Sequence, residues 1–259
     1  MVTGGKIIAV VFVFALAACG NGESKLSGPL PSEPPADQSV GGIWEGVDTD
    51  AMTIVALSTE SGRIRFINDT WRQGVGTATV DDTSVTIGYT LVPRFEAVLP
   101  DGSQSALCVA TGTVHERQSL DLTTDCTTES GMASSSSVTL TYNGLYDRDS
   151  SLSAIAGTYD DFGSILTIDS NGLLFEQNAS TGCVLNGQID LIDGEYNVYD
   201  MAIDISACRD VREIFNGSTF TGLATLDNSG NPEVLFAGLT GAVDGVIVSR
   251  VFEALSLSP

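Results

Sequence analysis

Carboxylates are the residues of this 259-residue chain with the most potential for chemistry, because they are abundant and several are paired. Close pairs occur at Asp48/Asp50, Asp81/Asp82 and Asp160/Asp161. Two carboxylates facing each other across a cleft can hydrolyse glycosidic bonds, and oxygen-rich loops can bind calcium. However, each pair falls at an expected turn or beside a strand, where Asp favours local hydrogen bonds, and none has EF-hand spacing. We therefore predict turn-forming roles, with Asp160 and Asp161 as the best candidates for an enzyme.

Histidine chemistry rests on one residue, His115, in the polar sequence His115-Glu116-Arg117-Gln118. A Ser-His-Asp arrangement needs a buried histidine beside a carboxylate and an oriented serine. We expect His115 to be exposed in a turn, and the sequence has no Gly-x-Ser-x-Gly nucleophile elbow. It also has no phosphate-binding loop and no dinucleotide fingerprint. The sequence thus predicts a protein that is not an enzyme and uses no cofactor.

The N-terminus carries an export signal, in which Lys6 precedes an unbroken apolar run from Ile7 to Ala18. The run has 12 residues, whereas a membrane-spanning helix needs roughly 20. Leu16-Ala17-Ala18-Cys19 resembles the end of a bacterial lipoprotein signal peptide, whose cysteine is lipidated and becomes the new N-terminus. The resemblance implies that residues 1–18 are removed and that acyl chains, palmitate among them, attach Cys19 to a membrane. An ordinary signal peptide with a chance cysteine is the alternative.

The residues after the signal peptide predict a flexible tether and a cellular location. In the lipoprotein family an Asp after the cysteine often retains the protein at the inner membrane, so Gly20 favours the outer membrane of the bacterial envelope. The stretch from Gly20 to about Gly42 has four prolines and almost no large apolar residue, so it cannot bury enough surface to fold. We expect residues 19–41 to be a flexible tether, with a docking segment for a partner as the alternative.

The chain is strongly acidic, with 33 Asp and Glu residues against 11 Lys and Arg residues and a net charge of −22. Phosphates would be repelled, which argues against nucleic-acid binding and against adhesion to an anionic membrane face other than through the lipid on Cys19. A basic protein partner would be attracted, and its association would be accelerated. Solubility of an exported protein accounts for the same charge without a partner.

Four cysteines lie in the body of the chain: Cys108, Cys126, Cys183 and Cys208. An even number in an exported protein favours two disulfides, whereas metal binding would need Cys-x-x-Cys spacing or nearby histidines. Three pairings are possible, and the sequence alone does not choose among them. Proximity favours Cys108–Cys126 and Cys183–Cys208, because a turn sequence lies midway between the members of each pair.

The body reads as short strands separated by turns. Apolar and polar residues alternate over Val138–Tyr142, Leu185–Leu191 and Tyr199–Ile205, as in strands with one face in a core. Hairpin turn signals such as Asn171-Gly172 punctuate these runs. The pattern predicts an all-β fold of antiparallel barrels or sandwiches. We expect the Ser-rich stretch Met132–Ser137 to be a loop.

A faint internal repeat divides the body in two. Gly42-Ile43-Trp44 opens one half and Gly157-Thr158-Tyr159 opens the other. We predict a first β-domain over 42–147 and a second over 154–255, joined by a polar link. An opening Gly-x-Trp or Gly-x-Tyr before a meander is similar to the lipocalin-like (calycin) small barrels, and this resemblance implies two tandem barrels. One continuous sandwich is the competing interpretation.

Small barrels of about eight strands either fill with side chains or hold one small ligand. Six aromatic residues would line such a cavity if the barrels are open: Trp44, Trp71, Tyr89, Tyr142, Tyr159 and Phe175. A filled core is the default expectation.

Together these features predict a membrane-anchored envelope lipoprotein that acts as a non-catalytic binding module for a protein or a small ligand. One alternative is an inhibitor or immunity protein against a basic cell-wall hydrolase such as a lysozyme, because known lysozyme-inhibiting lipoproteins are small, disulfide-stapled β-domains. Another is a structural component of an envelope assembly that pairs a sheet edge with a partner strand. The functional assignments are Cys19 for lipidation and the four body cysteines for disulfides, with no catalytic or metal-binding residue.

Overall fold

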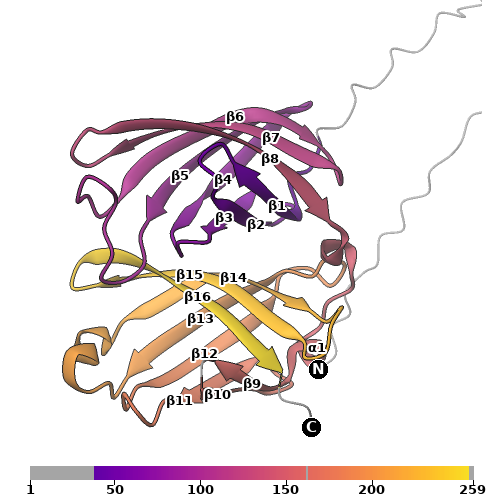
Figure 1. Ribbon diagram of the computed structural model, residues 1–259. Helices are drawn as coiled ribbons and strands as arrows, with labels where there is room; N and C mark the ends of the chain where they lie inside the picture. The colour runs from indigo at the N-terminus through magenta and orange to yellow at the C-terminus, as the bar shows by residue number, and fades with distance from the viewer. Residues whose placement is uncertain (1–37, 162, 257–259) are drawn as a thin grey trace, which may run out of the picture. The chain divides into compact units, whose positions relative to one another are not determined.

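The computed structural model describes residues 38–161 and 163–256, whose strands form two closed antiparallel barrels (Figure 1). The predicted signal peptide 1–18, Cys19 and most of the predicted tether lie outside the described residues. Both barrels belong to one compact unit. Within the described part of the chain, no helix has the length and apolar character needed to cross a membrane.

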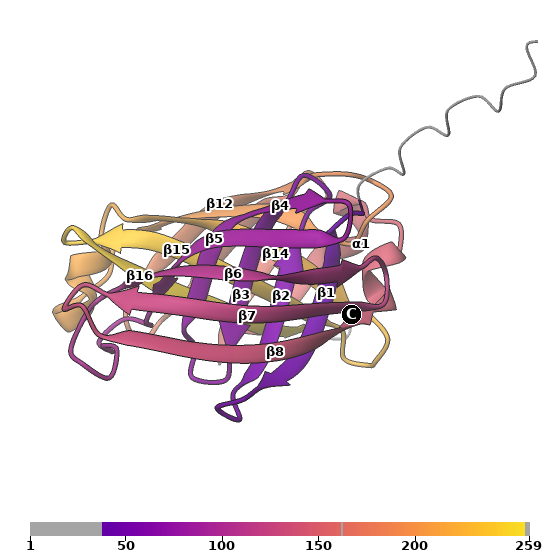
Figure 2. The same cartoon turned by 90° about the horizontal axis from the view of Figure 1, so that it is seen from above.

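The first barrel is a meander in which each strand pairs with the next and the last strand pairs with the first. Its strands are β1 (Gly42–Asp48), β2 (Thr53–Ser58), β3 (Arg63–Asn68), β4 (Gln73–Asp81), β5 (Ser84–Val92), β6 (Ala106–His115), β7 (Ser119–Thr128) and β8 (Ala133–Asn143). Strands β5 to β8 lie side by side in Figure 2. The barrel closes where Trp44 of β1 faces Tyr142 of β8.

Two short helices, η1 (Gly144–Asp147) and α1 (Leu152–Ile155), connect the barrels. The side chain of Ser151 caps α1 by accepting a hydrogen bond from the backbone N of Ala154 at 3.1 Å. The second barrel repeats the meander with β9 (Gly157–Asp161), β10 (Ser164–Ile168), β11 (Leu173–Gln177), β12 (Val184–Leu191), β13 (Tyr199–Ser206), β14 (Thr219–Asp227), β15 (Val234–Val243) and β16 (Val246–Ser256). A further short helix, η2 (Asp210–Phe215), lies between β13 and β14.

The prediction of an all-β fold with two tandem barrels is confirmed, and the competing interpretation of one continuous sandwich is wrong. The predicted loop over Met132–Ser137 is also wrong, because β8 begins at Ala133. Its backbone pairs with β7, with Ser134 opposite Cys126 and Ser136 opposite Thr124. Backbone pairing to a regular neighbour holds a serine-rich strand in place although serine has little intrinsic preference for strands.

The two disulfides each join the arms of one hairpin. Cys108 and Cys126 lie directly opposite each other on β6 and β7 and are bonded. Cys183 and Cys208 are bonded just outside the facing ends of β12 and β13. This is the pairing that proximity in the sequence favours.

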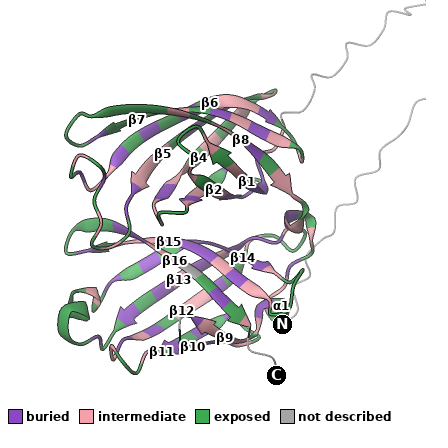
Figure 3. Ribbon diagram, in the orientation of Figure 1, coloured by how far each residue is buried: buried purple, intermediate pink, exposed green. Residues whose placement is uncertain are grey.

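Each barrel has its own apolar core, built from the inward residues of alternating strands (Figure 3). The second core contains more buried residues than the first and includes Leu185, Ile205 and Phe220. In the first barrel, the buried residues around Trp44 and Leu140 occupy the half that lies near β1 and the start of η1. The other half is where the candidate site lies.

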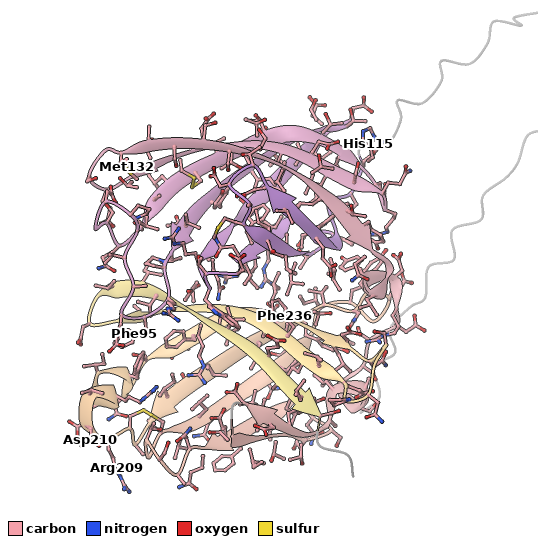
Figure 4. The ribbon with its side chains drawn as sticks, viewed as in Figure 1. Phe95, His115, Met132, Arg209, Asp210 and Phe236 are labelled. Atoms are coloured by element: carbon pink, nitrogen blue, oxygen red, sulfur yellow. A yellow bond between two sulfur atoms is a disulfide. The ribbon has the colours of Figure 1, made fainter. Side chains whose placement is uncertain are left out.

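Contacts of several kinds join the barrels. A shared apolar cluster contains Ile43 and Leu57 of the first barrel and Leu223 of the second. Phe95, in the loop between β5 and β6, packs its ring 4.5 Å from that of Phe215 and contacts the second core (Figure 4). The loops of the first barrel therefore help to cover the second.

Candidate functional site

The first barrel encloses a cavity of about 260 Å³, close to the lower end of ligand pockets, which is roughly 300 Å³. Turns at one end of the barrel form its mouth. Asp50 comes from the β1–β2 turn, Arg72 from the β3–β4 turn and Pro100 from the β5–β6 loop. Met132, labelled in Figure 4, comes from the β7–β8 turn. The cavity is therefore reached from the end where the odd-numbered strands finish.

The cavity walls are mostly apolar. Inward side chains that line it include Ile54, Phe66, Leu91, Leu122 and Val138. Tyr89 adds a phenol whose ring centroid lies 5.1 Å from that of Phe66. Burial raises the pKa of Tyr89, although a hydrogen bond with Thr124 partly opposes this rise. An apolar ligand would thus find mostly apolar walls, with polar side chains such as Tyr89 and Thr124 that could fix its orientation.

Small side chains explain why this half of the barrel is open. Gly74, Thr124, Ser134 and Ser136 all line the cavity. Glycine and short hydroxyl residues leave volume that leucine or phenylalanine would fill. In the second barrel, larger inward side chains such as Leu185, Ile205 and Phe220 leave a smaller cavity, of about 150 Å³. The empty space is therefore set by residue size at a few inward positions.

The opposite end of the first barrel is sealed by Trp44, which is completely buried. Its indole Nε1 donates to the carbonyl of Val40 at 3.0 Å and to Oγ of Ser58 at 3.1 Å. Its ring meets Tyr142 edge-on at a centroid distance of 5.2 Å. The indole thus has both a satisfied donor and a packed ring, as buried tryptophans require.

Arg117 of the β6–β7 turn strengthens this closed end. It donates to the carbonyl of Gly41 at 2.7 Å and pairs with Glu60 at 2.9 Å and Asp147 at 3.1 Å. Its guanidinium also lies 5.0 Å from the ring centroid of Tyr146, within range of a cation–π interaction. The turn, the entering chain and η1 are therefore tied together, and a ligand would enter from the other end.

Asp101 ties two of the loops at the mouth. Its carboxylate accepts hydrogen bonds from the hydroxyls of Thr128 and Ser130 and from the backbone N of Ser103, the last at 3.0 Å. The hydroxyl bonds from Ser130 and Thr128 hold the pKa of Asp101 well below its usual range. Asp101 thereby links the β5–β6 loop to the end of β7 and the turn that follows.

The sequence-predicted acidic pairs are not brought together. Asp48 and Asp50 lie at the cavity mouth, where Asp48 Oδ1 accepts backbone hydrogen bonds from Asp50 and Met52, both at 2.9 Å. Asp81 and Asp82 lie at the β4–β5 turn. His115 is exposed at the end of β6, as Figure 4 illustrates. No three His, Cys, Asp or Glu side chains in 38–161 and 163–256 are grouped so that they could hold a metal ion.

The six aromatic residues named as possible cavity residues divide among several places. Tyr89 lines the cavity. Trp44 and Tyr142 pack at the closed end, and Tyr159 is buried in the second core. Trp71 lies in the β3–β4 turn, and Phe175 is exposed on the outer face of β11. Of these six predicted residues, Tyr89 therefore lines the cavity and the other five do not.

The second barrel contains a second polar site, of which Asp161 alone was a candidate from the sequence. Asp161 is buried there beside Arg250, with Oδ2 of Asp161 3.4 Å from Nη2 of Arg250. Glu176 joins them, and burial together with the charge of Asp161 raises its pKa to about 7. Sequence reasoning missed Glu176, although a charged residue two positions after Leu174 on an alternating strand was a signal that it faces inward.

Comparison of the chain with protein-family models and with curated proteins finds no match.

Proposed function

We propose that the protein is a non-catalytic binding module whose first barrel holds one small, largely apolar ligand. The observation that carries the proposal is the cavity of about 260 Å³ with apolar walls and a mouth formed by turns. The half-buried pair Tyr89 and Thr124 supports it, because a few placed polar groups in an apolar pocket give a ligand its orientation. The rigid, sealed opposite end supports it further, since a preorganised pocket loses little entropy on binding.

The expected affinity is modest. Burying an apolar ligand contributes about 25 cal/mol for each Å² removed from water, and loss of overall motion on binding offsets much of that gain. For a cavity of this size we expect dissociation constants on the order of 10–100 μM for the best small ligands.

The cellular location is part of the same proposal. The Leu16-Ala17-Ala18-Cys19 sequence supports lipid attachment at Cys19, a bacterial envelope location and a binding module on a flexible tether. Loss of membrane association and of palmitate labelling in the Cys19→Ala variant is the expected result. Unchanged labelling in that variant would contradict it.

The alternative functions have weaker support. A partner strand would need a free sheet edge, and over the described residues the first barrel closes on itself. The net charge of −22 supports attraction of a basic protein, but it singles out no surface for an inhibitor. The cavity is a more specific observation in support of the small-ligand function.

A fluorescent probe tests the proposed function. N-Phenyl-1-naphthylamine is neutral and brightens in apolar surroundings, so titration with the purified protein should show saturable binding of one equivalent. Val138→Trp fills the cavity and should weaken binding at least tenfold, because Val138 lines it. Val47→Trp is the matched control, since Val47 is 58% exposed on the outer face of β1. No saturable binding, or equal binding by both variants, would overturn the proposal.

A further inference from the structure

The outer faces of the two barrels enclose a groove of about 300 Å³ where they meet. Residues of β1, β2 and the β8–η1 junction form the wall on the first barrel: Ile43, Glu45, Val55, Leu57, Asn143 and Leu145. Residues of β14, β15 and β16 form the wall on the second: Thr225, Asp227, Val234, Phe236 and Glu253. Figure 4 shows Phe236 at this place between the barrels. The groove therefore lies outside both barrel interiors.

The floor of the groove is apolar. Ile43 and Leu57 are buried in the apolar cluster that joins the barrels. Val55, Leu145 and Phe236 pack against that cluster but remain partly exposed. Covering these three side chains with another apolar group would be favourable in proportion to the area removed from water.

The three carboxylates of the groove each lie opposite an apolar residue of the neighbouring strand. The pairs are Glu45 with Val55, Asp227 with Val234, and Glu253 with Phe236. Residues directly opposite each other on adjacent strands have Cβ atoms about 5 Å apart. A ligand that covers the apolar side chains therefore comes within reach of the carboxylates.

These carboxylates are not neutralised by a cation of the chain itself. Among the described residues, no Lys or Arg lines the groove or forms an ion pair with any of the three. Arg148 acts on Asp227, but it donates to the carbonyl of Leu226 at 2.5 Å and does not line the groove. Nδ2 of Asn143 holds the carboxylate of Glu45 at 2.9 Å. The groove thus presents negative charge beside apolar surface, which favours a ligand with both cationic and apolar groups.

The spacing of the carboxylates favours a peptide over a single small cation. Asp227 and Glu253 are two strands apart and offset by two residues in the register of β14–β16. Strand geometry therefore separates them by roughly 12 Å. Glu45 lies on the other wall. One ammonium group cannot contact all three, whereas residues four apart in an extended peptide are separated by roughly 13 Å.

We propose that this groove is a docking site for a basic segment of a partner protein. Apolar side chains of the segment cover Val55 and Phe236. Its Lys or Arg side chains pair with Glu45, Asp227 and Glu253. The net charge of −22 attracts such a partner and accelerates its association. The groove is separate from the cavity of the first barrel, so this proposal does not rest on small-ligand binding there.

Fluorescence anisotropy of a labelled peptide, Lys-Leu-Lys-Phe-Lys, tests the proposal with the purified protein at physiological salt. Saturable binding of one equivalent is the expected result. A second labelled peptide, Lys-Gly-Lys-Gly-Lys, has the same charge but no large apolar side chain. It should bind at least tenfold more weakly, because two apolar side chains are no longer removed from water.

Matched variants separate the groove from the overall negative charge. The double variant Glu45→Gln with Glu253→Gln removes two charges from the groove and should weaken binding of Lys-Leu-Lys-Phe-Lys about fivefold. Glu116→Gln with Glu213→Gln removes the same charge at exposed positions outside the groove, so binding should change by less than about twofold. Val138→Trp, which fills the cavity of the first barrel, should leave peptide binding unchanged.

Other occupants of the groove give different results, each of which would overturn the proposal. Tighter peptide binding by Lys25→Gln would indicate that the chain's own N-terminal segment competes for the groove through Lys25. A wild-type dimer that the variant Glu45→Gln with Glu253→Gln separates into monomers, measured by sedimentation, would assign the groove to a second copy. Absence of saturable peptide binding, or equal losses in the two double variants, would also contradict a docking site here.

Discussion

A Cβ atom added at Gly74 would lie 2.8 Å from Cδ2 of Tyr89, so the cavity of the first barrel depends on a glycine beneath a tyrosine ring. Gly74→Ala should shift that ring and destabilise the protein by about 1–3 kcal/mol, as overpacked sites do. Gly88→Ala is the matched control on the adjacent strand, since a Cβ there meets nothing within 4 Å. Urea unfolding of both variants checks this, and equal stabilities would contradict the close contact.

Arg117 should hold the closed end of the first barrel through the geometry of its guanidinium. Lys keeps the charge in Arg117→Lys but cannot bond Gly41, Glu60 and Asp147 at once. We expect a loss of about 1–2 kcal/mol, because these contacts are partly exposed. Arg94→Lys, at an exposed loop position, should change stability by less than about 0.5 kcal/mol. Thermal unfolding of the two variants gives the comparison.

Asp101 should control the mouth of the cavity. Asp101→Asn removes the charge that holds the hydroxyls of Thr128 and Ser130, so the two loops should loosen and the probe should dissociate faster. In the wild type the stabilising effect of Asp101 is present at neutral pH. It should be lost as pH falls below the ordinary range of Asp, because its pKa is lowered in the fold. Stopped-flow measurement of the probe's dissociation rate at pH 7 checks this, with Asp125→Asn as the control. Dissociation rates equal to that of the wild type in both variants would contradict the prediction.

The two disulfides should stabilise the protein to similar extents but affect binding differently. They close loops of sequence separation 18 and 25, for which chain-entropy arguments give about 3 kcal/mol each. Cys126 lines the cavity, whereas Cys183 and Cys208 belong to the second barrel. Replacing Cys108 and Cys126 by Ala should therefore change probe affinity as well as stability, and replacing Cys183 and Cys208 should change stability alone. Melting and titration of both double variants test this difference.

The barrels could be predicted from the sequence because one face of their strands is exposed to solvent and the other is buried. The alternation over Leu185–Leu191 and Tyr199–Ile205 falls within β12 and β13. The nearest cysteines are also the bonded ones, since each pair brackets a hairpin turn. Local pattern and local proximity therefore located much of the architecture.

The cavity could not be predicted in the same way. Ser134 and Ser136 belong to a stretch whose composition indicates a loop, yet they line the cavity. Whether Thr124 points inward depends on the register of β7 against β8, which local composition does not reveal. Empty space arises when small residues from several strands meet, and that meeting is a property of the closed barrel.

The charge cluster of the second barrel was hidden for a related reason. Asp161, Glu176 and Arg250 come from β9, β11 and β16, and barrel closure brings them together. In the sequence Asp161 is next to Asp160, whereas in the structure it forms an ion pair with Arg250. Separation in the chain therefore concealed the partners.

Methyl NMR of the labelled protein during titration with N-phenyl-1-naphthylamine tests the central claim most directly, because it locates the ligand. Binding in the first barrel should shift the methyl signals of Ile54, Leu122 and Val138, which line the cavity. Signals of Ile205 and Val248 in the second barrel should stay in place. Shifts confined to the second barrel or to exposed outer-face residues such as Val47 and Val109 would contradict the assignment of the first barrel as the binding site.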